Sequence, residues 1–390
     1  MAKGDILNNF FHSYKDGFTG KKVTRLTGLD NLCHHPYFYN KMFTNDGRYL
    51  VYTMEVNGER EFYRMDLYNQ SSLQLTDEGG LCYFSANLSG DDKYLYFCRN
   101  KSIFRMNMIT LEEEIIYSTK AGWWAYDNPA LSSDGKYSIT IEINERDKIE
   151  TSSGWNLFEE QWKIKPECRI VLIDIEKKSG EVIYQDKCWL GHPQIRPNHN
   201  EDISFCHEGP SHVVDARLWF INKDGSNLRC ARPQQQDEMI THEFWLQDGS
   251  EMMYVYRIQN QDGKSTNDLV DTETFMPKVS DQDLKQSIMS LDPDTLKETF
   301  LMECSKYCHC TSAPDNKKIV GDGQLADEPY IYLADLTTRT EEILCIHGTS
   351  WKSYRTNQDS HPHPAFTPDG NKVIFTSDRE GLPAIYIVEM

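Results

Sequence analysis

Histidines provide the first indication of chemistry in this sequence, because twelve occur and two of them form the pattern His361-Pro362-His363. Imidazole nitrogens are common ligands of divalent cations, and a neutral imidazole also accepts a proton near neutral pH. Two residues in an i, i+2 pattern lie on the same side of an extended strand. We therefore expect His361 and His363 to offer two nitrogens to one metal ion, and His309 to complete a three-nitrogen site.

The elements that would position these histidines recur along the chain. An apolar strand, a short turn rich in Asp, Asn and Gly, and a second strand appear seven times. The turns are Asp46-Gly47, Asp91-Asp92, Asp134-Gly135, Asn198-His199, Asp248-Gly249, Asp315-Asn316 and Asp369-Gly370. A third and a fourth strand follow in most repeats, and repeats of about 40–50 residues with four antiparallel strands are typical of β-propeller blades. The sequence therefore predicts an all-β, seven-bladed β-propeller that forms a single domain over residues 1–390.

The two ends of the chain predict how the ring closes. The last repeat stops at Met390 after its third strand, whereas the segment 22–27 precedes the first repeat and resembles a fourth strand. We expect this N-terminal strand to complete the last blade, which would also cover an exposed sheet edge.

The position six residues before each turn is polar in every repeat. These residues are Asn40, Ser85, Asn128, His192, His242, His309 and His363. Equivalent positions of a propeller are related by rotation about the central axis, so these side chains should converge in the channel. We assign His242 as a general base, because it is one blade away from His309 and too far in angle to be an obvious ligand. A fourth metal ligand, or a purely structural ring of hydrogen bonds, is the alternative.

Further side chains near this ring are candidates for substrate contacts. Arg217 could bind a carboxylate through two parallel hydrogen bonds, although a surface ion pair fits its spacing equally well. His192 and His207 are candidate substrate-binding residues. The neighbours of His309, Cys308 and Cys310, should point away from whatever His309 faces, because alternate residues of a strand face opposite sides.

Composition restricts the partners and the compartment. The formal net charge of −19 opposes binding to nucleic acid and to anionic membranes, and no apolar run approaches the roughly 20 residues of a membrane span. Eleven cysteines without an export signal are typical of a reducing cytoplasm. An anionic substrate would need a local positive centre on such an acidic protein.

Two repeats are longer than the others. Inserts are predicted near residues 144–167 in the third blade, partly helical, and near residues 259–286 in the fifth. Inserts within repeats usually map to loops on one face, where lids and specificity elements are found. Surface decoration without a role is the alternative.

Three stretches and the opening strand resemble the oligogalacturonate lyase family over nearly the whole chain. They are Cys206-His207-Glu208-Gly209-Pro210 through Asp215-Ala216-Arg217-Leu218-Trp219, Thr241-His242-Glu243-Phe244-Trp245, His361-Pro362-His363-Pro364-Ala365-Phe366-Thr367-Pro368-Asp369, and Thr19-Gly20-Lys21-Lys22-Val23-Thr24-Arg25-Leu26-Thr27. The resemblance implies a cytoplasmic, seven-bladed propeller that cleaves short galacturonides with Mn²⁺. It also implies that His309, Gln358, His361 and His363 bind the metal, that His242 is the base and that Arg217 contacts the substrate.

The implied reaction is a β-elimination, in which the proton on carbon 5 of a uronate is removed and the glycosidic oxygen leaves carbon 4. That proton is very weakly acidic, because the resulting anion lies beside a carboxylate. A cation on the carboxylate neutralises this charge, and a positioned imidazole accelerates proton transfer by roughly 10²–10⁴. Softness alone would allow zinc, iron or nickel as well as manganese, so the metal identity rests on the resemblance.

Two other functions fit a propeller with a polar channel. One is a non-catalytic scaffold that binds protein or sugar, and the other is a metal-dependent hydrolase or lactonase. Product analysis separates them, because only elimination yields a 4-deoxy-5-keto-uronate.

Overall fold

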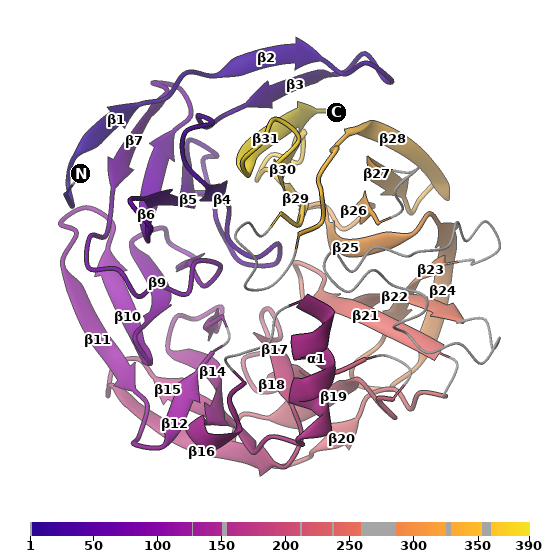
Figure 1. Cartoon of the computed structure of the whole chain (residues 1–390). Coiled ribbons are helices and arrows are strands. Elements are labelled where there is room, and N and C mark those ends of the chain that lie inside the picture. Colours follow the sequence, from indigo (N-terminus) through magenta and orange to yellow (C-terminus); the bar gives the residue numbers. More distant parts are fainter. Residues whose placement is uncertain are drawn as a thin grey trace.

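The computed structural model describes residues 2–126, 128–149, 154–210, 213–235, 238–258, 286–324, 329–352 and 360–390. Seven antiparallel sheets are arranged around a central axis, so the predicted seven-bladed propeller is confirmed (Figure 1). Apart from the N-terminal strands β1 (Ile6–Asn8), β2 (His12–Lys15) and β3 (Lys22–Arg25), the strands within a sheet follow one another in sequence order, as expected for blades built from consecutive hairpins.

Each blade is built mainly from four strands, which are ordered from the innermost strand at the channel to the outermost strand at the rim. Blades 1 to 3 comprise β4 (Cys33–His34), β5 (Tyr49–Val56), β6 (Glu59–Asp66) and β7 (Ser71–Gln74); β8 (Asn87–Leu88), β9 (Tyr94–Arg99), β10 (Ser102–Asn107) and β11 (Glu113–Ser118); and β12 (Trp123–Ala125), β13 (Ala130–Leu131), β14 (Tyr137–Asn144), β15 (Cys168–Asp174) and β16 (Ser179–Asp186). In blade 3, β12 and β13 both pair with β14.

Blades 4 to 7 follow the same plan. They comprise β17 (Leu190–Ile195), β18 (Asp202–His207), β19 (Leu218–Asn222) and β20 (Arg229–Cys230); β21 (Glu238–Trp245), β22 (Met252–Ile258), β23 (Gln286–Leu291) and β24 (Glu298–Cys304); β25 (Tyr307–Ser312), β26 (Lys318–Gly323), β27 (Tyr330–Asp335) and β28 (Thr340–Ile346); and β29 (Ala365–Phe366), β30 (Lys372–Ser377), β31 (Ala384–Glu389) and β3 (Lys22–Arg25).

The predicted turns have the backbone conformation that their residues favour. Each contains one residue with positive φ, namely Gly47, Asp92, Gly135, Asn198, Gly249, Asn316 and Gly370. Glycine, asparagine and aspartate adopt this left-handed conformation at lower cost than other residues. These turns therefore fix where each inner strand ends.

Apolar side chains hold the blades together. Among the described residues, seven buried clusters each join two neighbouring blades, and the cluster of Leu218, Phe220, Ile240, Met252 and Tyr254 between blades 4 and 5 is typical. Burial of apolar surface between blades makes the ring a rigid frame for the residues at its centre.

The ring closes as the sequence predicts. Strand β3 pairs with β31 through Val23 and Val388, so a strand from the N-terminus completes blade 7. Two further strands were not predicted: β1 (Ile6–Asn8) extends blade 1 outside β7, and β2 (His12–Lys15) extends blade 7 outside β3. The N-terminal segment thus covers the rims of both blades at the junction (Figure 1).

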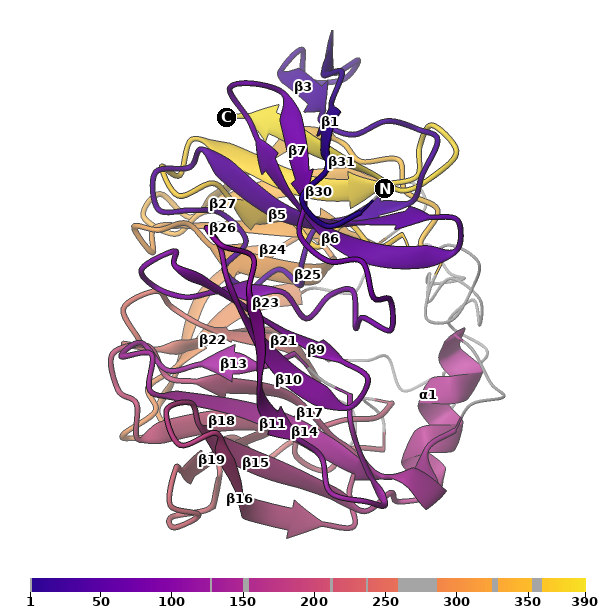
Figure 2. The same cartoon turned by 90° about the vertical axis from the view of Figure 1, so that its left-hand side faces the viewer.

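The insert predicted in blade 3 contains a short 3-10 helix (Glu145–Asp147) and helix α1 (Gly154–Lys163). The views in Figures 1 and 2 place α1 outside one face of the ring. Phe158 on α1 packs against Trp189, which directly precedes β17, with 4.9 Å between ring centroids. Residues 259–285 of the insert predicted in blade 5 lie outside the described part of the chain.

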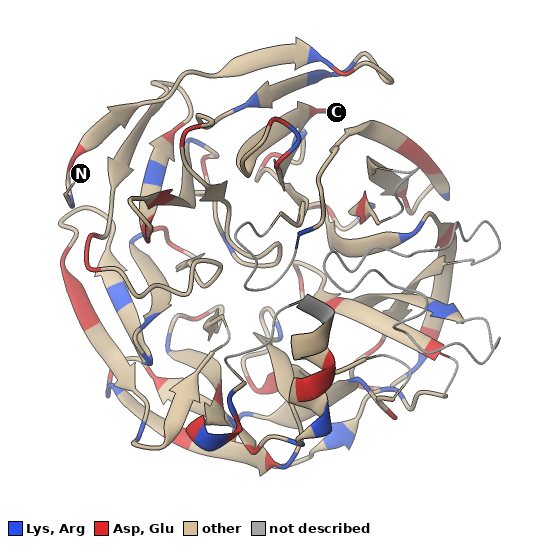
Figure 3. Ribbon diagram, viewed as in Figure 1, with Lys and Arg blue, Asp and Glu red and all other residues tan. Residues whose placement is uncertain are grey.

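Acidic and basic residues are interspersed around the ring, and neither sign occupies one sector in this view (Figure 3). Among the described residues, no helix combines the length and the apolar character needed to span a membrane.

Candidate metal centre and catalytic site

The inner strands of blades 4, 5 and 6 share an irregularity at the position predicted to face the channel. Each contains a β-bulge, located between Gly191 and Gln194, between Thr241 and Phe244, and between Tyr307 and Cys310. The backbone of His192 and His242 is left-handed there, with φ of 52° and 54°, and His363 in blade 7 has φ of 47°. A bulge redirects side chains that a regular strand would alternate.

Three of the predicted histidines lie together in the channel. In His309, His361 and His363 the candidate ligand atoms all lie within 4.8 Å of one another, and the three side chains are buried. The ring centroids of His309 and His363 are 4.2 Å apart. Burial and the neighbouring histidines lower the pKa of His363 well below its usual value, which keeps it neutral. Three imidazoles facing one point suit a divalent cation.

Residues 360–364 are not a strand, although His361 and His363 were predicted to lie on one; β29 begins only at Ala365. The fourth predicted ligand, Gln358, lies outside the described residues. His35 holds the segment 360–364 in place, because one of its ring nitrogens is 3.1 Å from the carbonyl oxygen of Pro362.

Asp322 fixes the orientation of two of these histidines, and sequence reasoning missed it. The Nδ1–H group of His309 donates to Oδ2 of Asp322 at 2.9 Å, and the backbone N–H groups of His309 and His363 donate to the same carboxylate at 2.6 and 3.2 Å. The carboxylate is fully buried. With Nδ1 protonated, His309 directs the lone pair of Nε2 away from Asp322, the arrangement typical of metal-binding histidines.

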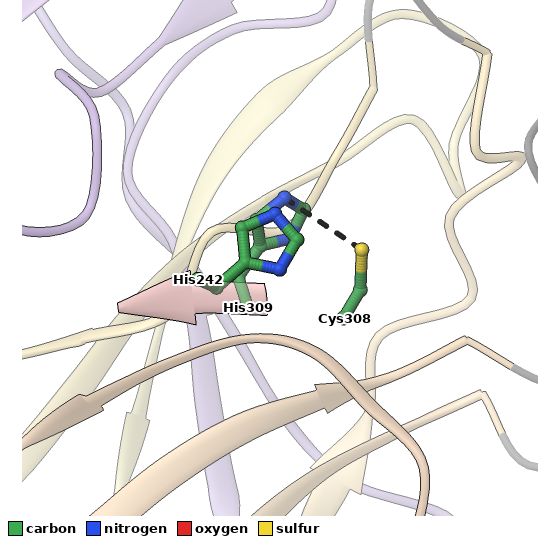
Figure 4. Close-up of side chains that lie close together, drawn as sticks. All are labelled: His242, Cys308 and His309. Atoms are coloured by element: carbon green, nitrogen blue, oxygen red, sulfur yellow. Dashed lines mark hydrogen bonds between the residues drawn. The ribbon is translucent and has the colours of Figure 1, made fainter. Parts of the chain in front are cut away.

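His242 lies closer to His309 than its place in the ring predicted. Their ring centroids are 4.3 Å apart, so the expectation that His242 is too far in angle is wrong. The bulge brings Cys308 to the same side, where its Sγ is 3.7 Å from Nε2 of His309 (Figure 4). The prediction that both flanking cysteines point away is thus wrong for Cys308, whereas Cys310 is buried in the apolar core between blades 5 and 6.

His242 has the properties of a neutral imidazole. Burial, followed by the neighbouring histidines and Arg217, lowers its pKa well below the usual value. Its Nδ1 lies 2.7 Å from Oγ1 of Thr241. A neutral histidine whose Nδ1–H donates to a hydroxyl retains a lone pair on Nε2 that can accept a proton.

Arg217 is buried and paired, so the alternative of a surface ion pair is wrong. Its Nη1 donates to Oε1 of Glu208 at 2.8 Å, and its Nε donates to Oε2 of Glu243 at 2.9 Å. Burial alone would raise the pKa of Glu208, but Arg217 and His192 lower it to about 2. The Nε2 atom of His192 lies 3.5 Å from the carboxylate of Glu208, and its Nδ1 atom lies 3.5 Å from that of Glu243.

The other predicted positions have different environments. His207 stacks on Trp219 at 4.7 Å between centroids, and burial lowers its pKa to about 4. Asn40 and Ser85 are structural: the amide of Asn40 donates to the carbonyls of Phe84 and Ala86, and the Ser85 hydroxyl donates to the carbonyl of Cys82.

An aromatic segment forms the floor beneath the histidines. The ring of Tyr37 is 4.9 Å from that of His363, and the ring of Phe38 is 5.7 Å from that of His309. On its other side, the same segment lines a cavity of about 540 Å³ at the end of the channel where the turns lie. The segment therefore separates the histidines from the opposite mouth of the channel. The sequence signal that could have indicated this segment is the run of three aromatic residues within residues 37–40.

Comparisons with known proteins agree with this architecture. The family model described as oligogalacturonate lyase matches residues 1–390. The oligogalacturonide lyase of Pectobacterium atrosepticum and the oligogalacturonate lyase of Dickeya dadantii are each 36% identical, over 100% of this chain and 98% of the relative.

Solved structures give the same result. The structure of an oligogalacturonate lyase in complex with manganese is 36% identical with a TM-score of 0.90, and the crystal structure of the oligogalacturonate lyase from Vibrio parahaemolyticus is 37% identical with a TM-score of 0.88. Both comparisons cover 100% of this chain and 98% of the other. The chain therefore belongs to the oligogalacturonate lyase family.

Proposed function

We propose that this protein cleaves short oligogalacturonides, such as digalacturonate, by metal-dependent β-elimination to a 4-deoxy-5-keto-uronate. The observation that carries the proposal is the convergence of His309, His361 and His363 on one point, with His242 beside them on a neighbouring blade. Membership of the family and the manganese complex of a relative support the substrate class and Mn²⁺.

In the proposed site, His309, His361 and His363 hold the metal ion, together with Gln358, which the family resemblance adds. The donor set fits, because three buried imidazoles leave coordination positions for oxygen ligands. When bound, a divalent cation would neutralise the uronate carboxylate and stabilise the negative charge that develops next to it.

His242 is the proposed base. In this proposal its Nδ1–H group donates to Oγ1 of Thr241, 2.7 Å away, which leaves the Nε2 lone pair to accept the proton from carbon 5. Because the pKa of His242 is lowered, the imidazole is neutral at neutral pH and can take the proton.

Arg217 is proposed to orient the substrate carboxylate. A guanidinium has five N–H donors, and bonds to Glu208 and Glu243 use three of them within the described structure. One N–H on each terminal nitrogen is left for a ligand. His192, between the same two glutamates, is proposed to contact the sugar. The predicted role of His207 in substrate binding stays a prediction.

We propose a cytoplasmic location, because the chain has eleven cysteines and the structure joins none of the described ones in a disulfide.

The activity of variants on digalacturonate with Mn²⁺ tests the assignment. We expect His242→Ala to retain Mn²⁺ and lose at least 100-fold in kcat, and His363→Ala to lose both Mn²⁺ binding and activity. His12→Ala, an exposed histidine on β2, is the control and should behave as the unmodified protein. Undiminished elimination by His242→Ala would show that another group is the base, and a hydrolysed product without a keto group would refute elimination.

A further inference from the structure

A second set of metal-binding side chains shares one residue with the three-histidine cluster. The candidate ligand atoms of His242, Cys308 and His309 all lie within 4.8 Å of one another (Figure 4). The Sγ atom of Cys308 is 3.7 Å from Nε2 of His309, and the rings of His242 and His309 are 4.3 Å apart. The set thus combines two imidazoles and one thiol from β21 and β25.

The β-bulge in β25 creates this set. In a regular strand Cys308 and His309 would face opposite sides, but the register shift between Tyr307 and Cys310 brings both to the channel. Cys310, which follows the bulge, is buried in the apolar core between blades 5 and 6, whereas Cys308 is half-buried. Only one of the two cysteines is therefore placed to bind an ion.

The separation between Cys308 and His309 suits a tetrahedral ion that binds sulfur. Typical bonds of about 2.3 Å from zinc to sulfur and about 2.0–2.1 Å from zinc to nitrogen separate the two ligand atoms by about 3.6 Å. The observed separation between Cys308 and His309 is 3.7 Å. A soft thiolate favours zinc-like ions over Mn²⁺, which prefers oxygen ligands.

We propose that His242, Cys308 and His309 form a second cation site for a thiophilic divalent cation such as Zn²⁺ or Cd²⁺. Binding replaces the thiol proton of Cys308, which leaves for solvent, so the thiolate offsets one charge of the cation.

The two sets cannot be filled at the same time. Asp322 occupies Nδ1 of His309, so only the lone pair of Nε2 is available to an ion. A cation held by Cys308 would remove His309 from the three-histidine cluster and would also occupy a nitrogen of His242. Thiophilic cations should therefore inhibit the enzyme competitively with Mn²⁺; this consequence, unlike the binding itself, rests on the proposed function.

Titration of the full-length protein with Cd²⁺, followed by the ultraviolet thiolate-to-cadmium absorption, tests the site. We expect Cys308→Ser and Cys308→Ala to weaken Cd²⁺ binding at least 10-fold. Cys230→Ser, which changes a half-buried cysteine on β20, should bind Cd²⁺ as the unmodified protein does. Cadmium binding and absorption unchanged in both Cys308 variants would overturn the proposal.

A third variant separates this proposal from the function of the three-histidine cluster. His361→Ala lacks one residue of that cluster but keeps His242, Cys308 and His309, so its Cd²⁺ absorption should persist while Mn²⁺ binding is lost. Loss of the Cd²⁺ absorption in His361→Ala would contradict a separate donor set. Inhibition by Cd²⁺ is measured at fixed Mn²⁺ and expressed relative to the uninhibited rate of each protein. Cys308→Ser should need at least 10-fold more Cd²⁺ than the unmodified protein for the same degree of inhibition. Equal sensitivity would refute mutual exclusion.

Discussion

At the scale of single residues, the histidines of one ring differ in their chemical properties because each contacts a different group. His309 donates to a buried carboxylate, His242 lies against a hydroxyl, and His192 lies between two glutamates. The first arrangement suits a metal ligand and the second a neutral base.

The change Asp322→Asn tests how His309 is held. An asparagine oxygen cannot serve all three N–H groups that Asp322 accepts, so His309 loses its fixed tautomer. We expect Mn²⁺ affinity to fall about 10–100-fold, measured by electron paramagnetic resonance of free Mn²⁺. Asp224→Asn, in an exposed turn of blade 4, is the control. Unchanged affinity in Asp322→Asn would show that Asp322 does not position the ligands.

Glu208 should make the stability of the protein depend on acidic pH. Its pKa falls from an ordinary 4.5 to about 2 in the folded state, so its ion pair with Arg217 stabilises the fold above pH 4.5 and is lost as the pH falls toward 2. We expect Glu208→Gln to remove about 3 kcal/mol of the pH-dependent loss in unfolding free energy over that range, measured by denaturant titrations. Exposed Glu181→Gln should not change the slope. Parallel curves for Glu208→Gln and the unmodified protein would contradict this.

The sequence indicated the histidines but not the residues that orient the side chains of the site through hydrogen bonds. A repeat offset found His242, His309 and His363, because the blades are related by rotation. Asp322 and Glu243 carry no comparable signal, since their roles depend on contacts across strands and blades. The support that His35 gives to Pro362 likewise arises from residues distant in sequence.

At the scale of elements, the bulged inner strands decide what faces the channel. Alternation predicted the orientation of Cys310 correctly and that of Cys308 wrongly, because a bulge inserts one residue and the period of two fails there. No sequence pattern marked the bulges, so the neighbourhood of Cys308 could not be predicted.

Gly321 on β26 leaves room for the ring of Tyr307 on β25, the strand that carries His309. A methyl group on Gly321 would lie 2.4 Å from Cγ of Tyr307, so Gly321→Ala must displace the ring or the strand. We expect Gly321→Ala to cost about 1–3 kcal/mol of unfolding free energy and to weaken Mn²⁺ binding, measured by denaturant and metal titrations. Gly90→Ala, where a methyl group meets nothing within 4 Å, is the matched control. Equal stability of the two variants would contradict the close packing.

At the scale of the whole molecule, the fold was predictable because the repeat appears seven times and one missing strand is supplied by the N-terminus. The extra rim strands β1 and β2 were not predictable, since short exposed segments lack a hydrophobic pattern. The net charge of −19 is spread over the ring, so under the proposed function the metal ion would supply the local positive charge for an anionic substrate, because Glu208 and Glu243 offset the charge of Arg217.

Leu26→Ala tests the closure of the ring. Leu26 follows β3 and is buried in the cluster between blades 7 and 1, so its truncation should cost about 2–5 kcal/mol of unfolding free energy. Leu228→Ala, at a position that is 43% exposed, should have a small effect in the same denaturant titration. A small effect of Leu26→Ala would mean that the junction contributes little to stability.

The most direct test of the account is anomalous X-ray diffraction at the manganese edge from crystals of the protein grown with Mn²⁺ and an oligogalacturonide. We predict one strong peak within bonding distance of His309, His361 and His363, with a uronate carboxylate on the ion and Nε2 of His242 facing carbon 5. A manganese peak elsewhere, or a substrate whose carbon 5 lies away from His242, would contradict the account.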